Sequence, residues 1–381
     1  MIMTAETQIR SYKQDFCLPK HGVYLLSHSV GRPLITSHAA FVNDFFSPWQ
    51  EGNTEPWGQW LAIITEFQQA LATLFNHKPE CFCPQVNLSS ALCKLVMSHP
   101  RLRAPKAQIL MSEQDFPSMG FALSRALPDC DIRFIPQKAD ITDIATWQQY
   151  MQPSISLVFI SQVYSNTGQQ APVAEIVDLS KQLDCLSLVD VAQSAGIINL
   201  DLQQLDVDFM IGSAVKWLCA GPGAAYLWVN PKHLTDCEPV DVGWFSHENP
   251  FEFNIHDFRY HPSALRFWGG TPSIAPYALA AHSIGYFNQQ APTVLQAHNQ
   301  HLVDKLIQAF PQQLNSPTDT AKRSGTVILD FKDKQTQILN ALKAVNIAVD
   351  ARCLGVRVSP HLYNDLKDIE QFIDQVTQSL S

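Results

Sequence analysis

Lys216 stands alone in an otherwise apolar run, "VDFMIGSAVKWLCAGPGAAYLWV" (residues 207–229). An unpaired charge in apolar surroundings is costly, so a lysine at this position needs a specific reason. Its amine can condense with an aldehyde to form a Schiff base, which makes the amine part of a bound ligand. Asp190 precedes it by 216 − 190 = 26 residues, at the end of another apolar run. The pair predicts carbonyl chemistry; the alternatives are a helix N-cap at Asp190 and a lysine whose amine reaches solvent.

The elements that must position these two residues are expected to be short strands. Several apolar runs are rich in β-branched or aromatic residues and show no alternation, which is typical of strands buried on both faces. These runs are 107–112, 155–161, 185–190 and 207–212. Helical patterns such as 173–184 lie between them, so the sequence predicts an α/β fold with a mainly parallel sheet covered by helices. Residues 223–229 follow a very short turn and are expected to form an antiparallel strand.

Ligands of open parallel sheets bind beyond the carboxyl ends of the strands, and the polar residues of this chain gather there. Asp190 and Lys216 follow two of the runs, and Phe116 follows a third. Ser89 and Ser90 stand at an expected helix start, where free amides and the helix dipole suit a phosphate. An amine, a carboxylate, a phosphate cradle and an aromatic face together match the needs of pyridoxal 5′-phosphate. The carboxylate keeps its pyridine nitrogen protonated, and the aromatic ring packs on its face.

The order of several motifs resembles the aminotransferase class V group of fold-type I enzymes, which depend on pyridoxal phosphate. "DVAQSAG" followed by "SAVK" at residues 213–216 is similar to the aspartate and lysine motifs of kynureninases and cysteine desulfurases. Kynureninases are the most similar group. The segments that resemble them are "YLLSHSVGRPL" (24–34), "GWFSHE" (243–248) and "GVRVSPHLYND" (355–365). "GGTPS" (269–273) is similar to a desulfurase segment.

The resemblance implies a role for each matching residue. Lys216 would form the Schiff base and later move the α-proton, and Asp190 would pair with the pyridine nitrogen. The other cofactor contacts it implies are Gln193, Phe116, Ser89, Ser90, Ser213 and Thr167, with Trp244 and Thr271 reaching the cofactor from the partner subunit of a homodimer. Arg357 would bind the carboxylate of an amino-acid substrate, which Ser29 would also contact.

Simpler interpretations of these residues remain open. Arg357 could instead pair with a structural carboxylate such as Asp350, and Phe116 could belong only to the core. Ser89 and Ser90 could serve only as caps. Trp244 and Thr271 could simply fill the junction between domains.

The chain departs from the kynureninase pattern at positions that bear on the reaction. Val215 stands where those enzymes carry a tyrosine, Met119 where they carry an acidic residue, and Gln193 where histidine is common. The resemblance therefore implies a kynureninase-like hydrolase or lyase that cleaves at Cβ, with three alternatives. These are a class V aminotransferase, a cysteine desulfurase or C–S lyase, and a non-catalytic relative that binds the cofactor. Cys353 is expected to be structural, because the loop that carries it is too short for a desulfurase nucleophile.

The sequence predicts two domains with a leading segment. Residues 1–45 are expected to pack with the small domain, residues 46–275 to form the large cofactor-binding domain, and residues 276–381 to form a smaller α/β domain with a connecting helix. That helix is expected to run from about 274 to 310 without a break. The segment 240–272, rich in aromatic residues, proline and glycine, is expected to form ordered loops.

Composition excludes several other classes of protein. The formal net charge is −9 and no basic cluster is interleaved with aromatic residues, so nucleic-acid binding is not expected. No apolar run approaches the length of a membrane span, and no targeting segment is recognised, which favours the cytoplasm. The nine cysteines are scattered and the thirteen histidines show no ligand spacing. Reduced thiols and no metal are therefore expected.

Overall fold

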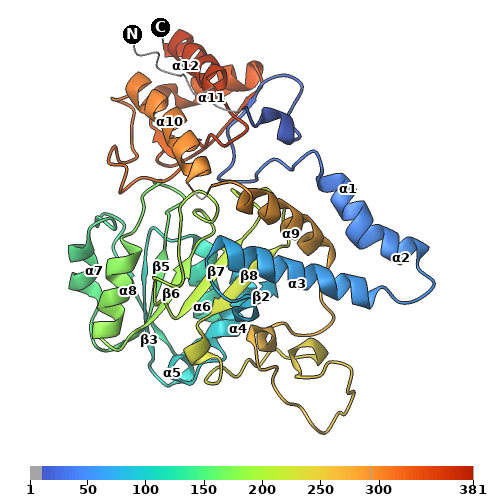
Figure 1. Cartoon of the computed structure of the whole chain (residues 1–381). Coiled ribbons are helices and arrows are strands. Elements are labelled where there is room, and N and C mark those ends of the chain that lie inside the picture. The colour runs from blue at the N-terminus through green and yellow to red at the C-terminus, as the bar shows by residue number, and fades with distance from the viewer. Residues whose placement is uncertain (1–10, 292, 381) are drawn as a thin grey trace, which may run out of the picture.

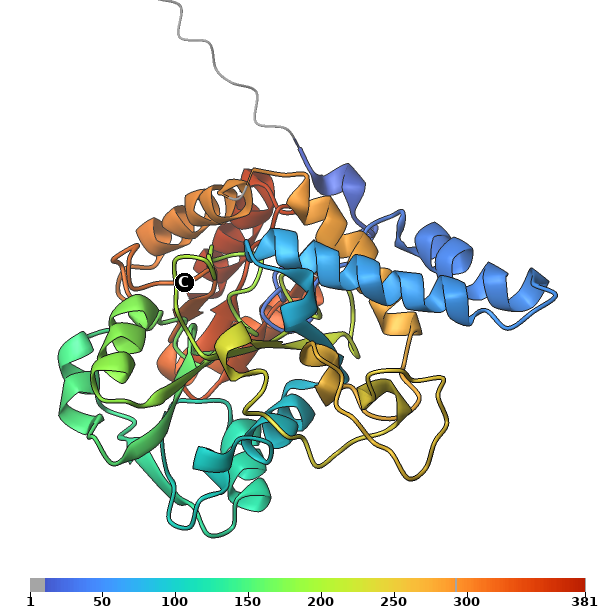
Figure 2. The same cartoon turned by 60° about the horizontal axis from the view of Figure 1, so that its bottom comes forward.

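The computed structural model describes residues 11–291 and 293–380. A seven-stranded sheet with helices on both faces forms the larger part of the molecule, and a smaller group of helices and short strands lies beyond one end of it (Figure 1). This is the expected α/β architecture of two parts. Helices α1 (Ser37–Phe41) and α2 (Ser47–Glu51) and the start of α3 (Trp57–Leu74) project away from the body of the molecule (Figures 1 and 2).

The central sheet has the strand order β2-β8-β7-β6-β5-β3-β4. Its strands are β2 (Phe82–Gln85), β3 (Gln108–Ser112), β4 (Asp131–Ile135), β5 (Ile155–Ser161), β6 (Leu186–Asp190), β7 (Phe209–Ser213) and β8 (Ala225–Val229). Strands β4, β3, β5, β6 and β7 pair in parallel, whereas β8 pairs antiparallel with both β7 and β2. The antiparallel strand expected at 223–229 is therefore confirmed. The turn before it uses Gly221 and Gly223 at φ of 75° and 96°, which other residues rarely adopt.

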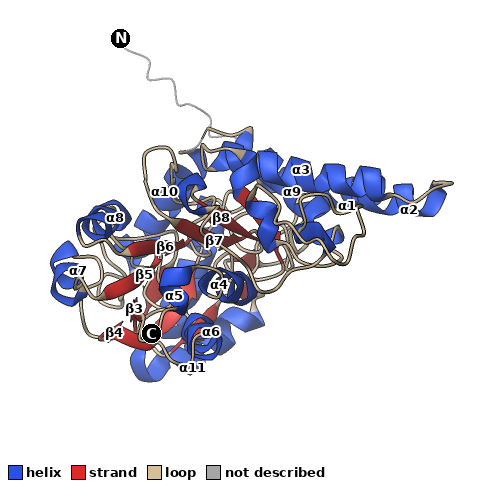
Figure 3. Ribbon diagram, turned by 90° about the horizontal axis from the view of Figure 1, so that it is seen from below, coloured by secondary structure: helices blue, strands red, loops and turns tan. Residues whose placement is uncertain are grey.

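Helices cover both faces of this sheet because its inner strands are apolar throughout. One face carries α4 (Leu88–Val96), α5 (Pro100–Arg103) and α6 (Pro117–Ala126). The other carries α3 (Trp57–Leu74), α7 (Ile144–Tyr150), α8 (Val173–Gln182) and α9 (Ala275–Asn288). The view from below shows the sheet between α7 and α8 on one side and α4, α5 and α6 on the other (Figure 3). Within the described ranges, no helix is both long and apolar enough to cross a bilayer.

The smaller part is built from the C-terminal chain and a short N-terminal strand. Strands β11 (Asp350–Arg352), β12 (Gly355–Val358) and β9 (Val327–Leu329) form an antiparallel sheet in that order. Its core is shared with α10 (Val294–Ala309), α11 (Gln335–Ala344) and α12 (Leu366–Leu380). Strand β1 (Val23–Tyr24) pairs in parallel with β10 (Ile347–Ala348), so the leading segment contacts this part of the molecule. Residues 1–10 of that predicted segment lie outside the described residues.

The predicted helix over 274–310 was wrong, because two helices occupy this stretch. Helix α9 ends at Asn288 and α10 begins at Val294. The sequence between them, "QQAPT", contains a proline, which lacks the amide a continuous helix needs and disfavours helical geometry in the preceding residue. The remaining short helices of the N-terminal arm are α1 (Ser37–Phe41) and α2 (Ser47–Glu51), joined by a π-helical turn (Val42–Phe46).

The aromatic segment 240–272 forms loops with two short 3₁₀ turns, Trp244–Ser246 and Ala264–Phe267. Phe245 and Phe267 are buried, as expected for ordered loops. Other apolar side chains of the segment are not buried: Phe253 is 76% exposed and Ile255 is 91% exposed. The expectation that its aromatic residues are buried therefore holds for only part of the segment in this single chain.

Candidate active site

A cavity of about 260 Å³ lies beyond the carboxyl ends of β5, β6 and β7. It is lined by six residues that the sequence singled out: Ser89, Phe116, Asp190, Gln193, Ser213 and Lys216. Its other lining residues are Asn87, Leu88, Gln114, Ser118, Met119, Ser161, Val163, Tyr164, Ser165, Ala192 and Val215. The cavity thus lies where an open parallel sheet is expected to hold its ligand.

The backbone around Lys216 is held by a loop from the N-terminal part of the chain. The Gly31 amide donates to the Val215 carbonyl at 2.9 Å. A Cβ atom on Gly31 would lie only 2.1 Å from the Lys216 carbonyl oxygen, so only glycine allows this close approach. The Cys219 amide donates to that same oxygen at 3.1 Å. The loop after β7 is therefore fixed from both sides, and it delivers the lysine into the cavity.

The amine of Lys216 is set up as a nucleophile. Burial lowers its pKa to about 8; the charge of Asp190 opposes this effect, and the charges of Arg352 and Arg357 add to it. Across residues 11–291 and 293–380, no hydrogen bond or ion pair engages its Nζ atom. A neutral amine is the form that attacks an aldehyde, so a lowered pKa makes the lysine reactive near neutral pH.

Cofactor-free protein should therefore capture pyridoxal phosphate at a rate that rises as pH increases through about 8. An ordinary lysine would show this rise at about pH 10.4. Asp190→Asn should move the midpoint to lower pH, because the aspartate charge favours the protonated amine. Arg352→Ala should move it to higher pH, because the guanidinium disfavours that form. Stopped-flow absorbance measures the rates, and a wild-type midpoint near pH 10 would contradict the geometry.

Asp190 ends strand β6 and is 7% exposed. Its Oδ1 atom accepts a hydrogen bond from the Ala192 amide at 2.8 Å. Burial raises the pKa of this carboxyl to about 6, although the Ala192 amide and the Lys216 charge act to lower it. A pyridinium nitrogen placed against the carboxyl would stabilise the charged form further. Gln193 lies beside it, and its amide donates to the His28 carbonyl at 3.2 Å.

The start of α4 forms the other end of the cavity. Asn87 caps this nine-residue helix, accepting from the Ser90 amide at 2.8 Å and from the Ser89 hydroxyl at 2.9 Å. Leu88 and Ser89 line the cavity at the positive end of the helix dipole, which suits a phosphate. Ser90, whose amide donates to Asn87, does not line the cavity. Ser90 instead lines a neighbouring surface hollow with Lys94. Asn87 was not singled out from the sequence, although an asparagine before a helix is a recognised cap signal.

The residues present fit pyridoxal phosphate. The buried lysine, the buried carboxyl and a helix N-terminus line one cavity, and these are the kinds of group that the aldehyde, the pyridine nitrogen and the phosphate of the cofactor would need. Phe116 lines the same cavity and is 46% exposed, so it is not a core residue and its ring is free to stack on a ligand. These properties match a bound aldehyde, a pyridine nitrogen and a phosphate.

Four other predicted contacts lie outside the cavity of this chain. Thr167 accepts from the Gln169 amide at 3.2 Å and lies in a turn beyond β5. Ser29 and Thr271 are exposed. Trp244 packs edge-on against Trp57, with ring centroids 5.7 Å apart. The roles of Trp244 and Thr271 were expected from a partner subunit, so those roles stay predictions.

Arg357 is engaged by a carboxylate, as in the simpler interpretation. It is 3% exposed, and Asp350 is its direct cross-strand neighbour in the β11–β12 ladder. Its Nε donates to Asp350 at 2.7 Å, its Nη2 also bonds that carboxylate, and its Nη1 donates to the Ser165 carbonyl at 3.1 Å. His28 contacts the same carboxylate at 2.9 Å. In this arrangement no side of the Arg357 guanidinium is free for a substrate, because the ladder register places an acid opposite it.

Arg352 is an arginine near the cavity that was not singled out from the sequence. Its Nη1 donates to Ser165 Oγ at 3.0 Å and to Asn166 Oδ1 at 2.7 Å, and its guanidinium lies 5.9 Å from the centre of the Phe116 ring. Ser165 and Phe116 line the cavity, so the charge of Arg352 lies beside it. Arg357 was chosen from the sequence because it lies in the segment 355–365 that resembles kynureninases, and the strand register pairs that arginine with Asp350.

Asp115 is a second residue that the sequence analysis missed. It is buried, and its Oδ2 accepts from the Ser112 amide at 2.7 Å. Burial raises its pKa to about 7, opposed by hydrogen bonds from Ser161 and Ser112. A carboxyl that titrates near neutrality next to a cavity is a candidate participant in proton movement. The sequence signal for Asp115 was its position directly before Phe116, just after the end of β3.

Fold and site together define an α/β enzyme of fold type I that depends on pyridoxal phosphate. The family model for aminotransferase class V matches residues 87–372, which include Lys216 and Asp190. The chain belongs to the aminotransferase class V family. The predicted family, fold class and cofactor are thereby confirmed.

Relatives named kynureninase match nearly the whole chain. A kynureninase of Xanthomonas campestris is 27% identical over 98% of this chain and 96% of its own length. A kynureninase of Shouchella clausii is 26% identical, covering 96% of this chain and 90% of its own. Among solved structures, a cysteine desulfurase from Thermococcus onnurineus has a TM-score of 0.83 at 19% identity, covering 94% of both chains. The cystine C–S lyase C-DES has a TM-score of 0.84 at 20% identity, covering 94% of this chain and 98% of its own. The structural matches share the fold.

Proposed function

We propose that this protein is a kynureninase-like enzyme that cleaves a bond at Cβ of an α-amino acid. The observation that supports the proposal is one cavity that is lined by Lys216, Asp190 and the start of α4. Arg352 lies close to this cavity, over the ring of Phe116. Similarity to kynureninases over nearly the full chain supports the choice of reaction.

Each residue of the cavity has a defined task in this proposal. Pyridoxal phosphate, when bound, supplies the electron sink that lets bonds to the α-carbon of an amino acid break. Lys216 would hold the cofactor, and its neutral amine could take the α-proton of the substrate. Asp190, in its buried position on β6, would keep the pyridine nitrogen protonated. Phe116 would pack on the ring face, and the amides at the start of α4 would hold the phosphate.

Cysteine desulfurase or C–S lyase activity is the second candidate. Gln193 favours it, because a glutamine at this position resembles the desulfurase motif, whereas kynureninases commonly carry a histidine there. Cys353 argues against a desulfurase, since it is exposed in the tight turn between β11 and β12 and does not line the cavity. Among the described lining residues of the cavity, none is a cysteine.

We also propose that Arg352 binds the carboxylate of the substrate. Arg352→Ala should raise KM roughly 10- to 100-fold with a smaller change in kcat, because a charge-assisted hydrogen bond to the carboxylate is lost. Arg357→Ala should instead remove a buried side chain and leave the partly exposed carboxylate of Asp350 without the arginine that bonds it. That variant should show a lower thermal unfolding midpoint. Steady-state kinetics and thermal unfolding of both variants separate the roles, and a KM effect confined to Arg357→Ala would reverse them.

The proposed enzyme works as a homodimer. Exposed apolar side chains in the segment 250–258, including Phe251, Phe253 and Ile255, offer a surface for a second copy of the chain. Trp244 packs behind them and would then approach the neighbouring cavity. Sedimentation of Phe253→Asp together with Ile255→Asp should show monomers where the wild type sediments as a dimer; a monomeric wild type would contradict this assembly.

The reaction is tested with a panel of amino acids in deuterium oxide. Exchange of the α-proton identifies substrates that reach the cofactor, and release of alanine from kynurenine then identifies the proposed cleavage. Two results without cleavage of kynurenine would favour the second candidate: alanine from cysteine, with the released sulfur reduced to sulfide by an added thiol, or pyruvate, ammonia and sulfide from cysteine. Cofactor binding without exchange on any amino acid would show that the chain is a non-catalytic relative, and would overturn the proposal.

A further inference from the structure

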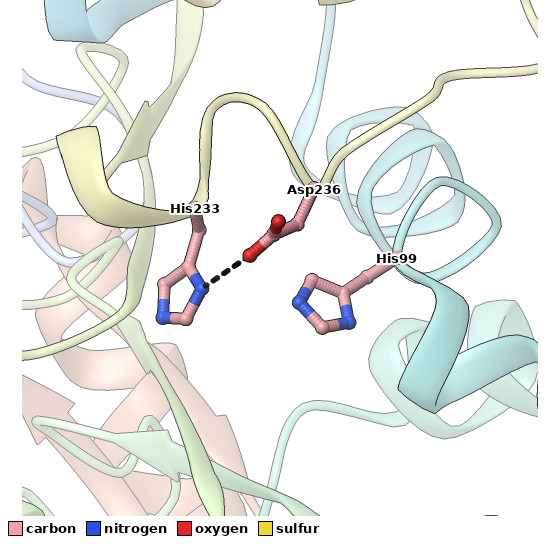
Figure 4. Close-up of side chains that lie close together, drawn as sticks. All are labelled: His99, His233 and Asp236. Atoms are coloured by element: carbon pink, nitrogen blue, oxygen red, sulfur yellow. Dashed lines mark ion pairs between the residues drawn. The ribbon is translucent and has the colours of Figure 1, made fainter.

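Three side chains with metal-ligand atoms meet near the amino ends of the parallel strands, opposite the strand ends that border the cavity. His99 lies directly before α5, while His233 and Asp236 follow β8. One possible ligand atom from each lies within 4.8 Å of the other two (Figure 4). Asp208, which stands just before β7, contacts His233. The cluster is therefore at the amino ends of the parallel strands, away from the cavity that holds Lys216.

Two nitrogen atoms of this cluster are buried without a partner. His99 is 3% exposed, and its Nε2 has no hydrogen-bond partner among the described residues. His233 Nδ1 likewise lacks a hydrogen bond and lies 3.7 Å from the Asp236 carboxylate. Buried polar atoms normally have partners, so two orphaned nitrogens facing one carboxylate point to a missing ligand.

Asp208 sets the orientation of His233. His233 Nε2 and Asp208 Oδ1 are 2.7 Å apart, and the same carboxyl contacts Lys232 at 2.9 Å and the Ser187 amide at 2.8 Å. A hydrogen bond from His233 Nε2 to the Asp208 carboxyl places the imidazole proton on Nε2, which leaves the lone pair of Nδ1 directed into the cluster. A carboxylate behind a histidine is the usual support of a metal-binding imidazole.

We propose that His99, His233 and Asp236 form a binding site for a divalent transition metal, with zinc the best match. Two imidazole nitrogens, one carboxylate oxygen and a water would complete a tetrahedral set. His99 Nδ1 accepts a long bond from the Arg101 amide at 3.3 Å, so binding through Nε2 moves the ring proton to Nδ1 at the cost of that bond. The metal ties the start of α5 to the segment after β8. Its distance from the cavity makes it a structural ion.

The sequence predicted no metal, because it shows no ligand motif of regular spacing. His233 and Asp236 are three residues apart, but the third ligand comes from more than a hundred positions earlier. The fold brings the segment after β8 to the start of α5, where the Glu238 amide donates to the Ser98 carbonyl at 3.1 Å. Such a site cannot be recognised from local spacing.

The test uses cofactor-loaded protein that has been stripped with a chelator and titrated calorimetrically with zinc. The wild type should bind one ion per chain, and zinc should raise its thermal unfolding midpoint. His99→Gln and Asp236→Asn should each weaken binding at least roughly tenfold and abolish the thermal effect. His21→Gln, an exposed histidine elsewhere, should behave as the wild type. The visible cofactor band and the activity should be unchanged in all three variants, which also shows that they fold.

The free thiols of this chain could also bind zinc, so the ligands must be identified. Cobalt substitution and X-ray absorption should show nitrogen and oxygen ligands with no sulfur. Sulfur ligands, absence of binding at one ion per chain, or equal zinc affinity in the wild type and Asp236→Asn would each overturn the proposal. Asp236→Asn is the decisive variant, because its side chain is half exposed and its loss does not open the core.

Discussion

Lys216→Ala should abolish the visible absorption band of the bound cofactor and reduce turnover at least ~10³-fold. The lysine both attaches the cofactor and moves the α-proton, and a proton transfer by a positioned group alone contributes about 10²- to 10⁴-fold. Absorbance spectra and steady-state rates measure the two effects. Because Lys216 reaches a cavity and has no ion-pair partner among the described residues, its removal should not destabilise the fold.

Lys138→Ala is the matched control for this variant, since Lys138 is an exposed lysine away from the cavity. It should keep both the absorption band and the rate. If Lys216→Ala retained the band while another lysine variant lost it, the assignment of the attachment site would be wrong. Added small primary amines should restore part of the Lys216→Ala activity, because they can replace the missing base.

Asp190→Asn should lower kcat roughly 10²- to 10³-fold while leaving the cofactor bound. The carboxylate stabilises positive charge on the pyridine nitrogen, and losing one preorganised electrostatic partner in a buried site has an effect of this size. The substituted amide keeps the shape and can still accept from the Ala192 amide. Kinetics together with the position of the cofactor band measure the change.

Asp129→Asn, at an exposed aspartate, is the control and should have no effect. A second comparison uses Asp190→Glu, which restores the charge but not the distance and should recover only part of the rate. Full activity in Asp190→Asn would mean that the ring nitrogen is not held by this residue. The same result would leave the buried carboxyl at the end of β6 without a role in the reaction.

Most of the sheet could be predicted from the sequence because its inner strands are apolar on both faces. Strands β3, β5, β6, β7 and β8 lie within a few residues of their expected ranges. Strand β4 (Asp131–Ile135) was missed because it is an edge strand with exposed side chains, and its polar composition does not read as a buried strand. Strand β2 (Phe82–Gln85) was missed because it contains Pro84 and pairs only with β8.

The centre of the site could be predicted because its residues follow strand ends. Asp190 and Lys216 follow the neighbouring strands β6 and β7, so the fold rule for open sheets brings them to one cavity. The resemblance assigned the substrate carboxylate to Arg357, but the pairing of Arg357 with Asp350 and the approach of Arg352 to Phe116 depend on the strand register, which the sequence does not show. Ser90 was misplaced because Asn87, and not Ser89 or Ser90, caps the helix.

The attachment of the cofactor to Lys216 is tested most directly by chemical trapping. The loaded protein is reduced with borohydride and digested, and the lysine that carries the pyridoxyl group is identified by mass spectrometry. If Lys216 carries the cofactor, one modified peptide is expected, the one that contains Lys216 within "GSAVKWLC". Modification of a different lysine, or of none in protein that shows the visible band, would contradict it.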